Sequence, residues 1–134
     1  MRYYVDLIIG IIGSFISYLF GGWNTMIQTL LLFMVLDYLT GIIVAGVFHK
    51  SSKSASGALS SKAGFKGLAK KIVILIVICL TYRIDIMLNF NNTLYSIVVI
   101  AYITNESISI LENAIAMGIP VPKKLEEAIE NMKG

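Results

Sequence analysis

The chain has few charged residues for its length. Only 14% of its 134 residues are Asp, Glu, Lys or Arg, whereas 57% are hydrophobic, and the mean hydropathy is +0.80. An average soluble domain has about 25% charged residues. A chain this short and this apolar has too little polar surface to cover itself in water. The composition therefore excludes an ordinary soluble domain and favours an integral membrane protein.

Cysteine and histidine are nearly absent. The single cysteine, Cys79, excludes an intrachain disulfide, and its place in an apolar run indicates a small buried hydrophobic residue. The single histidine, His49, has no second histidine and no nearby cysteine with which to bind a metal ion. The sequence also shows no nucleophile paired with a histidine and no glycine-rich phosphate loop. We therefore expect no enzymatic activity, no metal and no cofactor.

Carboxylates are missing from residues 49–71, hereafter the basic loop. Lysines near the ends of spans are held on the cytoplasmic side of the membrane, so this segment predicts a cytoplasmic loop between two spans. It contains no arginine and one aromatic residue, whereas nucleic-acid surfaces combine Arg, Lys and stacking aromatics, so we expect no nucleic-acid partner. The lysines expected at the membrane surface are Lys50, Lys53, Lys62, Lys66, Lys70 and Lys71.

The second half of the basic loop has helical spacing. Phe65, Leu68 and Ile72 follow one face of a helix, and lysines follow another. Such a helix would lie on the inner leaflet, attracted by anionic lipids. Gly64 and Gly67 weaken this interpretation, and a flexible, solvated loop is the alternative.

Four apolar segments predict four transmembrane helices, since a span needs about 17–25 residues. They cover roughly residues 5–20, 25–48, 72–88 and 94–111. The first segment resembles a signal peptide, but no small-residue cleavage site follows it, so a retained span is favoured. The fourth becomes polar in its second half, so an interfacial amphipathic helix is the alternative to a span.

Residues 112–134 predict a soluble tail. Gly118, Pro120 and Pro122 end the preceding helix, and Leu125 and Ile129 then keep helical spacing. The expected fold class is an all-α integral membrane protein: about four transmembrane helices within residues 1–111, the basic cytoplasmic loop, and a short amphipathic C-terminal helix. Alternation of the spans around the basic loop places both termini in the cytoplasm. If the fourth segment does not span, the C-terminus lies outside.

Several polar residues lie inside the predicted spans. A charged side chain there costs about 2.5–3.5 kcal/mol on insertion scales, so it should face protein or water rather than lipid. The candidates for pore lining or helix packing are Asp37, Thr40, Gly41, Arg83, Asp85, Asn105, Glu106 and Ser109. Arg83 lies near the end of its span, so its side chain could instead reach the outer interface. Four helices enclose little volume, so a large aqueous path would require oligomerisation.

Four short blocks occur in a characteristic order. They are LDYLTG at 36–41, SSKAGFKG at 60–67, NESISILEN at 105–113 and GIPVP at 118–122. Together they resemble the toxin secretion/phage lysis holin family, which includes the clostridial toxin-release holins. The resemblance covers residue 36 to the C-terminus, and the first apolar segment carries no matching motif. Ser107 stands where the family often has glycine.

The resemblance implies a function. Such holins accumulate in the cytoplasmic membrane of the bacterial host, form homo-oligomers and open lesions at a set time. The lesions release an endolysin, a functional partner that need not touch the holin, and relatives serve in toxin export. The expected partners are therefore the lipid bilayer and further copies of the chain. A small ion channel or transporter subunit is the alternative, and a membrane scaffold without conductance is a third interpretation.

Overall fold

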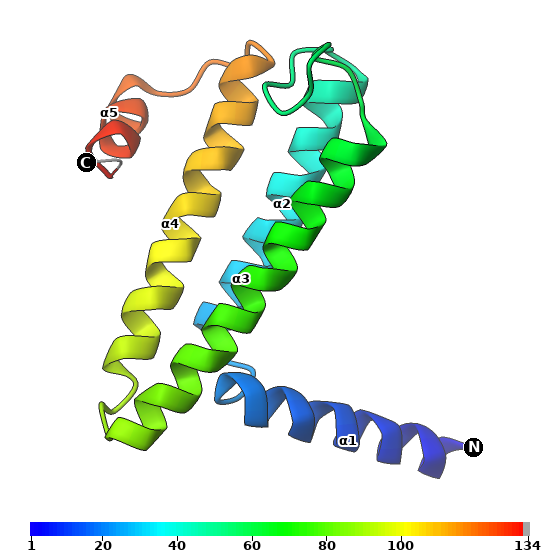
Figure 1. The fold of residues 1–134 in the computed structure, drawn as a ribbon, viewed down its shortest axis with the longest axis vertical. Coiled ribbons are helices and arrows are strands. Elements are labelled where there is room, and N and C mark those ends of the chain that lie inside the picture. Colours follow the sequence, from blue (N-terminus) through cyan, green and yellow to red (C-terminus); the bar gives the residue numbers. More distant parts are fainter. Residues whose placement is uncertain (133–134) are drawn as a thin grey trace.

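The computed structural model describes residues 1–132, which form five α-helices and no strand (Figure 1). The all-helical fold class with a short C-terminal helix is confirmed. The helices are α1 (Arg2–Phe20), α2 (Thr25–Gly46), α3 (Ser61–Leu88), α4 (Thr93–Ala116) and α5 (Lys123–Met132).

Helices α2, α3 and α4 form the body of the molecule (Figure 1). α4 packs most extensively against α2 and next most against α3. The buried apolar core lies where α2 begins, α3 ends and α4 begins. Its members are Ile27, Leu30, Met34, Ile78, Tyr95 and Val99. Because α4 contacts both other helices, it positions the polar side chains that α2 and α3 direct toward it.

The two ends of this bundle differ in chemistry. At one end α2 stops, the loop 47–60 follows, α3 begins and α4 ends near α5 (Figure 1); this is hereafter the basic end. The opposite end holds the α3–α4 turn, where Asn89, Asn91 and Asn92 have positive φ angles of 56°, 51° and 64°. Asparagine tolerates this left-handed conformation better than most residues. This uncharged turn is therefore built from residues well suited to its conformation.

Helix α1 projects sideways from the end opposite the basic end (Figure 1). None of its residues is buried. It ends at Gly21, whose φ is 75°, and a side chain there would begin 2.5 Å from the ring of Tyr82. The hydroxyl of Tyr95 donates a hydrogen bond to the carbonyl oxygen of Phe20 at 2.9 Å. The C-terminal end of α1 is thus attached to the bundle, while most of the helix is exposed.

Three of the helices within residues 1–132 are long and apolar enough to cross a membrane, namely α1, α2 and α4. α3 fails this criterion because its most apolar 18 residues, 71–88, contain Lys71, Arg83 and Asp85. Its apolar middle part, residues 72–82, still packs against α4 and the core. Three of the four predicted spans therefore qualify by length and composition. The remaining one, residues 72–88, forms part of α3, a helix that contains too many charged residues to qualify.

Two helix boundaries differ from the predicted ones. α3 begins at Ser61, whose preceding residue Ser60 accepts a hydrogen bond from the backbone N–H of Ala63 at 3.3 Å. The second half of the basic loop is therefore helical, and the flexible-loop alternative is wrong for residues 61–71. α4 continues five residues past 111, because the helix-breaking Gly118, with φ of 79°, comes only after Ala116. Residues 133–134 of the predicted tail lie outside the described residues.

Candidate functional site: a buried polar network across three helices

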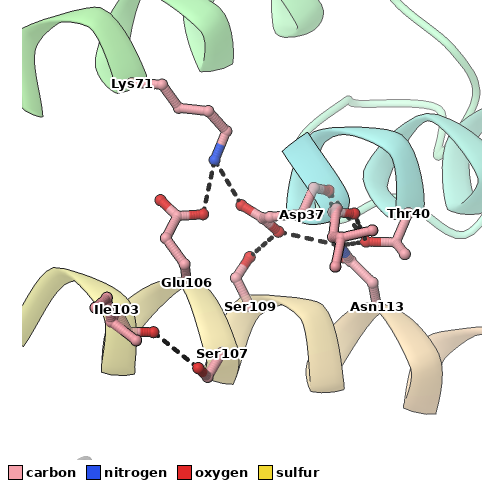
Figure 2. A network of polar contacts seen from close by, with 9 residues as sticks. Asp37, Thr40, Lys71, Ile103, Glu106, Ser107, Ser109 and Asn113 are labelled. Carbon is pink, nitrogen blue, oxygen red and sulfur yellow. Dashed lines mark hydrogen bonds and ion pairs between the residues drawn. The ribbon is translucent and has the colours of Figure 1, made fainter. Parts of the chain in front are cut away.

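Lys71 stands at the centre of a polar network inside the bundle (Figure 2). Its Nζ lies 2.8 Å from Oδ2 of Asp37 on α2 and 2.8 Å from Oε2 of Glu106 on α4. Each ion pair is also a charge-assisted hydrogen bond, which is shorter and stronger than one between neutral groups. One ammonium group from α3 thus joins carboxylates from the two helices that flank it.

The second oxygen of Asp37 is held by α4. Ser109 Oγ donates to Asp37 Oδ1 at 2.6 Å, and Asn113 Nδ2 donates to the same oxygen at 3.2 Å. Asn113 Nδ2 also lies 2.8 Å from Thr40 Oγ1, so the amide bridges two polar groups of α2 (Figure 2). Asp37 therefore has partners on both α3 and α4, and its position depends on all three helices.

The network is nearly closed to solvent. The side chains of Asp37, Glu106 and Lys71 are 6%, 5% and 14% exposed. Two carboxylates share one ammonium group, so the ionised network carries one excess negative charge. Hydrogen bonds from Ser109 and Asn113 offset part of the cost of that charge. Throughout residues 1–132, no buried side-chain nitrogen or oxygen lacks a hydrogen-bond partner.

Lys71 was expected at the membrane surface with the other lysines, and that expectation is wrong. The remaining five, Lys50, Lys53, Lys62, Lys66 and Lys70, are exposed. Residue 71 lies within α3, which is already helical at residue 61. Lys71 differs from the others because the helix turns its side chain toward α2 and α4, where it bonds Asp37 and Glu106. The lysine that adjoins the apolar run supplies the counter-charge for the intramembrane acids.

Asp85 and Arg83 belong to a separate cluster. Asp85 is 1% exposed, and its two carboxylate oxygens accept hydrogen bonds from the backbone N–H groups of Asn92 and Tyr95 at 2.8 and 2.9 Å. These groups lie at the N-terminal end of α4, which favours negative charge. The guanidinium of Arg83 is exposed and lies 4.5 Å from the ring centre of Tyr18 on α1. Neither residue contacts the network around Asp37.

A cavity of about 380 Å³ opens beside the network at the basic end. Gly41 and Asn105 line it, together with the three charged residues of the network. No three His, Cys, Asp or Glu side chains gather as metal ligands in the part of the chain that the structure describes. The arrangement holds charge between helices.

The sequence-based candidates omitted Asn113, which the structure places in the network. A pattern was available for it. Glu106, Ser109 and Asn113 are spaced by three and four residues, so they occupy one face of α4. The same face points at Asp37 (Figure 2). Tyr95, which ties the end of α1 to the bundle, was omitted as well, and it carries no comparable pattern.

A model of the bacteriophage holin family matches residues 14–134, almost the whole chain. The chain belongs to the bacteriophage holin family. Holins are non-enzymatic membrane proteins, and the three apolar helices make this one a multi-pass membrane protein. The match includes α2, α3 and α4, so every residue of the network lies inside the part of the chain that defines the family.

Several bacterial proteins described as uncharacterized are similar in sequence to this chain. One from Listeria innocua is 42% identical over 127 residues, which are 93% of this chain and 85% of the relative. One from Listeria monocytogenes is 42% identical over 117 residues, covering 87% and 78%. A 14.9 kDa protein of Clostridium perfringens is 38% identical over 122 residues, covering 90% and 86%. No solved structure matches the chain.

Proposed function

We propose that this holin assembles into homo-oligomers in the bacterial cytoplasmic membrane and opens timed lesions that release an endolysin or, in a related use, a toxin. Membership of the holin family supports lysis as the biological setting. The observation that carries the mechanism is the Asp37–Lys71–Glu106 network, because charged groups inside candidate spans are buried between helices of a single protomer.

In the closed state the polar side chains face each other and the apolar side chains face lipid. Leu32 and Val35 of α2 are both 55% exposed, and Ile97 and Ile100 of α4 are 62% and 53% exposed. Such a protomer is compatible with hydrocarbon on its outside. Lesion formation begins when neighbouring protomers compete for these helices and the bundle separates. The polar faces of α2 and α4 then line water, where Asp37 and Glu106 are hydrated and no longer need Lys71.

This mechanism explains why the network draws on three helices. A group buried by its own helix would stay buried when the helices part, whereas Asp37 loses Lys71, Ser109 and Asn113 together. The cost of exposing the network to lipid keeps the bundle closed, and exposure to water removes that cost. The network therefore favours either a closed protomer or a water-filled assembly, and disfavours intermediate states.

The test is lysis timing in bacteria that also express an endolysin unable to cross the membrane by itself. Abrupt lysis that requires both proteins is expected. Asp37→Asn combined with Glu106→Gln should change the onset of lysis, because it leaves the buried Lys71 without a carboxylate partner and so weakens the closed bundle. Asp6→Asn is the matched control, since Asp6 is an exposed acid on α1 outside the network.

Two outcomes would overturn the proposal. An onset unchanged in the double variant would mean that the network does not control opening. Ion leakage and growth arrest without passage of the endolysin would instead indicate the alternative function, a small ion channel or transporter subunit.

A further inference from the structure

The cavity beside the network is lined in part by the basic loop. Its walls come from the C-terminal half of α2, the loop 47–60, the first turns of α3 and the middle of α4. Backbone hydrogen bonds close the loop on itself, for example from Ser51 N to the carbonyl oxygen of Gly57 at 3.0 Å. The loop therefore forms a folded wall of the cavity.

The exposed rim of this cavity is positively charged. Lys53, Lys66 and Lys70 line it and are exposed, and the described residues form no ion pair with any of the three. Asp37 and Glu106 are the carboxylates that line the cavity, and both are deeply buried and bound to Lys71. The rim of the cavity is therefore positively charged, whereas the charges deeper inside are largely neutralised by ion pairing.

Apolar side chains form another part of the walls. Ile42 and Ala45 of α2, Leu59 of the loop and Ile74 of α3 all line the cavity. Leu59 is 62% exposed although it is large and hydrophobic. A free phosphate ion would bind the lysines but leave these apolar walls in contact with water. A phospholipid would contact both, with its phosphate at the lysines and an acyl chain against the apolar walls.

We infer that this cavity binds an anionic phospholipid, with its phosphate at Lys66 and Lys70 and the upper part of one acyl chain against Ile42, Leu59 and Ile74. Lys66 and Lys70 are one helical turn apart on α3, so both ammonium groups reach the same anion. Basic pockets between transmembrane helices on the cytoplasmic side commonly take anionic headgroups. This site goes beyond lesion formation, and it can be present or absent whether or not the protein lyses cells.

The experiment is native mass spectrometry of the full-length protein released from detergent micelles. Dioleoyl phosphatidylglycerol is the probe, and dioleoyl phosphatidylcholine has the same chains without the net charge. The expected result is retention of one phosphatidylglycerol and little phosphatidylcholine. Lys66→Gln with Lys70→Gln should weaken retention by at least roughly tenfold, since each lysine near an anionic headgroup adds several-fold to binding.

The matched control is Lys50→Gln with Lys62→Gln. It removes the same charge from the same basic segment, but neither lysine lines the cavity. Retention in the control should stay within about twofold of the wild type, because attraction at a distance is weak compared with contact. Helix content measured by circular dichroism checks that each variant folds. If the Lys66/Lys70 variant does not fold, Lys53→Gln, which changes the loop rather than the helix, should still lower retention by roughly fivefold.

Three results would overturn the inference. An equal loss in the cavity and control variants would mean diffuse attraction by the basic loop. Equal retention of phosphatidylcholine would mean that the phosphate contacts carry no selectivity. Displacement of the lipid by inorganic phosphate at a comparable concentration would mean a site for the free ion.

Discussion

Two buried aspartates, Asp37 and Asp85, satisfy their carboxylates in different ways. Asp37 is bound by side chains of α3 and α4, which reach it from separate helices. Asp85 is bound by backbone N–H groups of the turn and helix that directly follow its own helix. The partners of Asp85 are at most ten residues away in sequence, whereas those of Asp37 are 34 to 76 residues away.

This difference separates two roles. If the bundle opens, the α3–α4 turn can move as a unit and Asp85 keeps both hydrogen bonds. Asp37 keeps its partners only while α2, α3 and α4 remain together. Asp85 is therefore a structural residue of one helical hairpin, and Asp37 reports on the assembly of the whole bundle. The distinction was not visible from charge and hydropathy, which place both acids within apolar segments.

The largest expected effect comes from Lys71→Met. This change leaves two buried carboxylates without a counter-charge, and breaking a buried pair in this way costs about 3–5 kcal/mol of stability. Reversible unfolding in mixed detergent micelles, followed by circular dichroism, measures the loss. Lys62→Met is the control, since Lys62 lies on the same helix and is exposed.

The same variant offers an internal rescue. Adding Asp37→Asn and Glu106→Gln to Lys71→Met removes the uncompensated charges, so most of the lost stability should return. A Lys71→Met variant as stable as its Lys62→Met control would contradict the contrast between the two aspartates, because the network would then contribute nothing to bundle assembly.

An intermediate effect is expected for Asp85→Ala. It removes the acceptor of two backbone N–H groups at the start of α4, and hydrogen bonds to a charged group contribute about 1.5–3 kcal/mol each. We expect a loss of about 2–3 kcal/mol, less than the sum of two such bonds because water can replace the bond to the exposed Asn92. The loss should be smaller for Asp85→Asn, which retains one acceptor oxygen.

The contrast between the two aspartates also predicts that the free-energy changes of mutations in the two clusters add. Asp85→Ala and Lys71→Met act on clusters that share no partner, so their free-energy changes should sum to within about 0.5 kcal/mol in the combined variant. A larger coupling in the same unfolding measurement would mean that the two ends of the bundle are linked, and that Asp85 does not belong to the hairpin alone.

The smallest effect is expected for Arg83→Gln. Arg83 lies over the ring of Tyr18 and forms no ion pair with Asp85 in the part of the chain that the structure describes. An exposed contact of this kind is worth about 0.5–1 kcal/mol. A double-mutant cycle with Tyr18→Leu should recover that energy, whereas a cycle with Asp85→Asn should show none. Strong coupling to Asp85 would mean that Asp85, rather than Tyr18, is the main partner of Arg83.

Much of the fold follows from local patterns. The apolar segments and the Gly118–Pro122 break placed most helix ends to within a few residues. The first half of α3 was harder, because Gly64 and Gly67 lower helix propensity and the lysines resemble a solvated loop. The Ser60 cap and continuation into the apolar run at Ile72 outweigh these glycines.

The candidate site was predicted only in part. Asp37, Thr40, Glu106 and Ser109 were identified because polar groups inside apolar segments need partners. Lys71 was misplaced and Asn113 omitted, since the identity of a partner depends on how helices rotate against each other. Helical spacing limits which residues share one face, but it does not state which face another helix covers.

The sequence by itself determined that the protein is helical, apolar enough for a membrane, and basic at one connection between helices. These properties depend on composition and on spacing along a single helix. Only the tertiary structure decided that Lys71 neutralises Asp37 and Glu106, and that Asp85 instead closes a hairpin. Pairing across helices depends on the rotation and register of α2, α3 and α4, and these are set by packing around the apolar core rather than by any local segment.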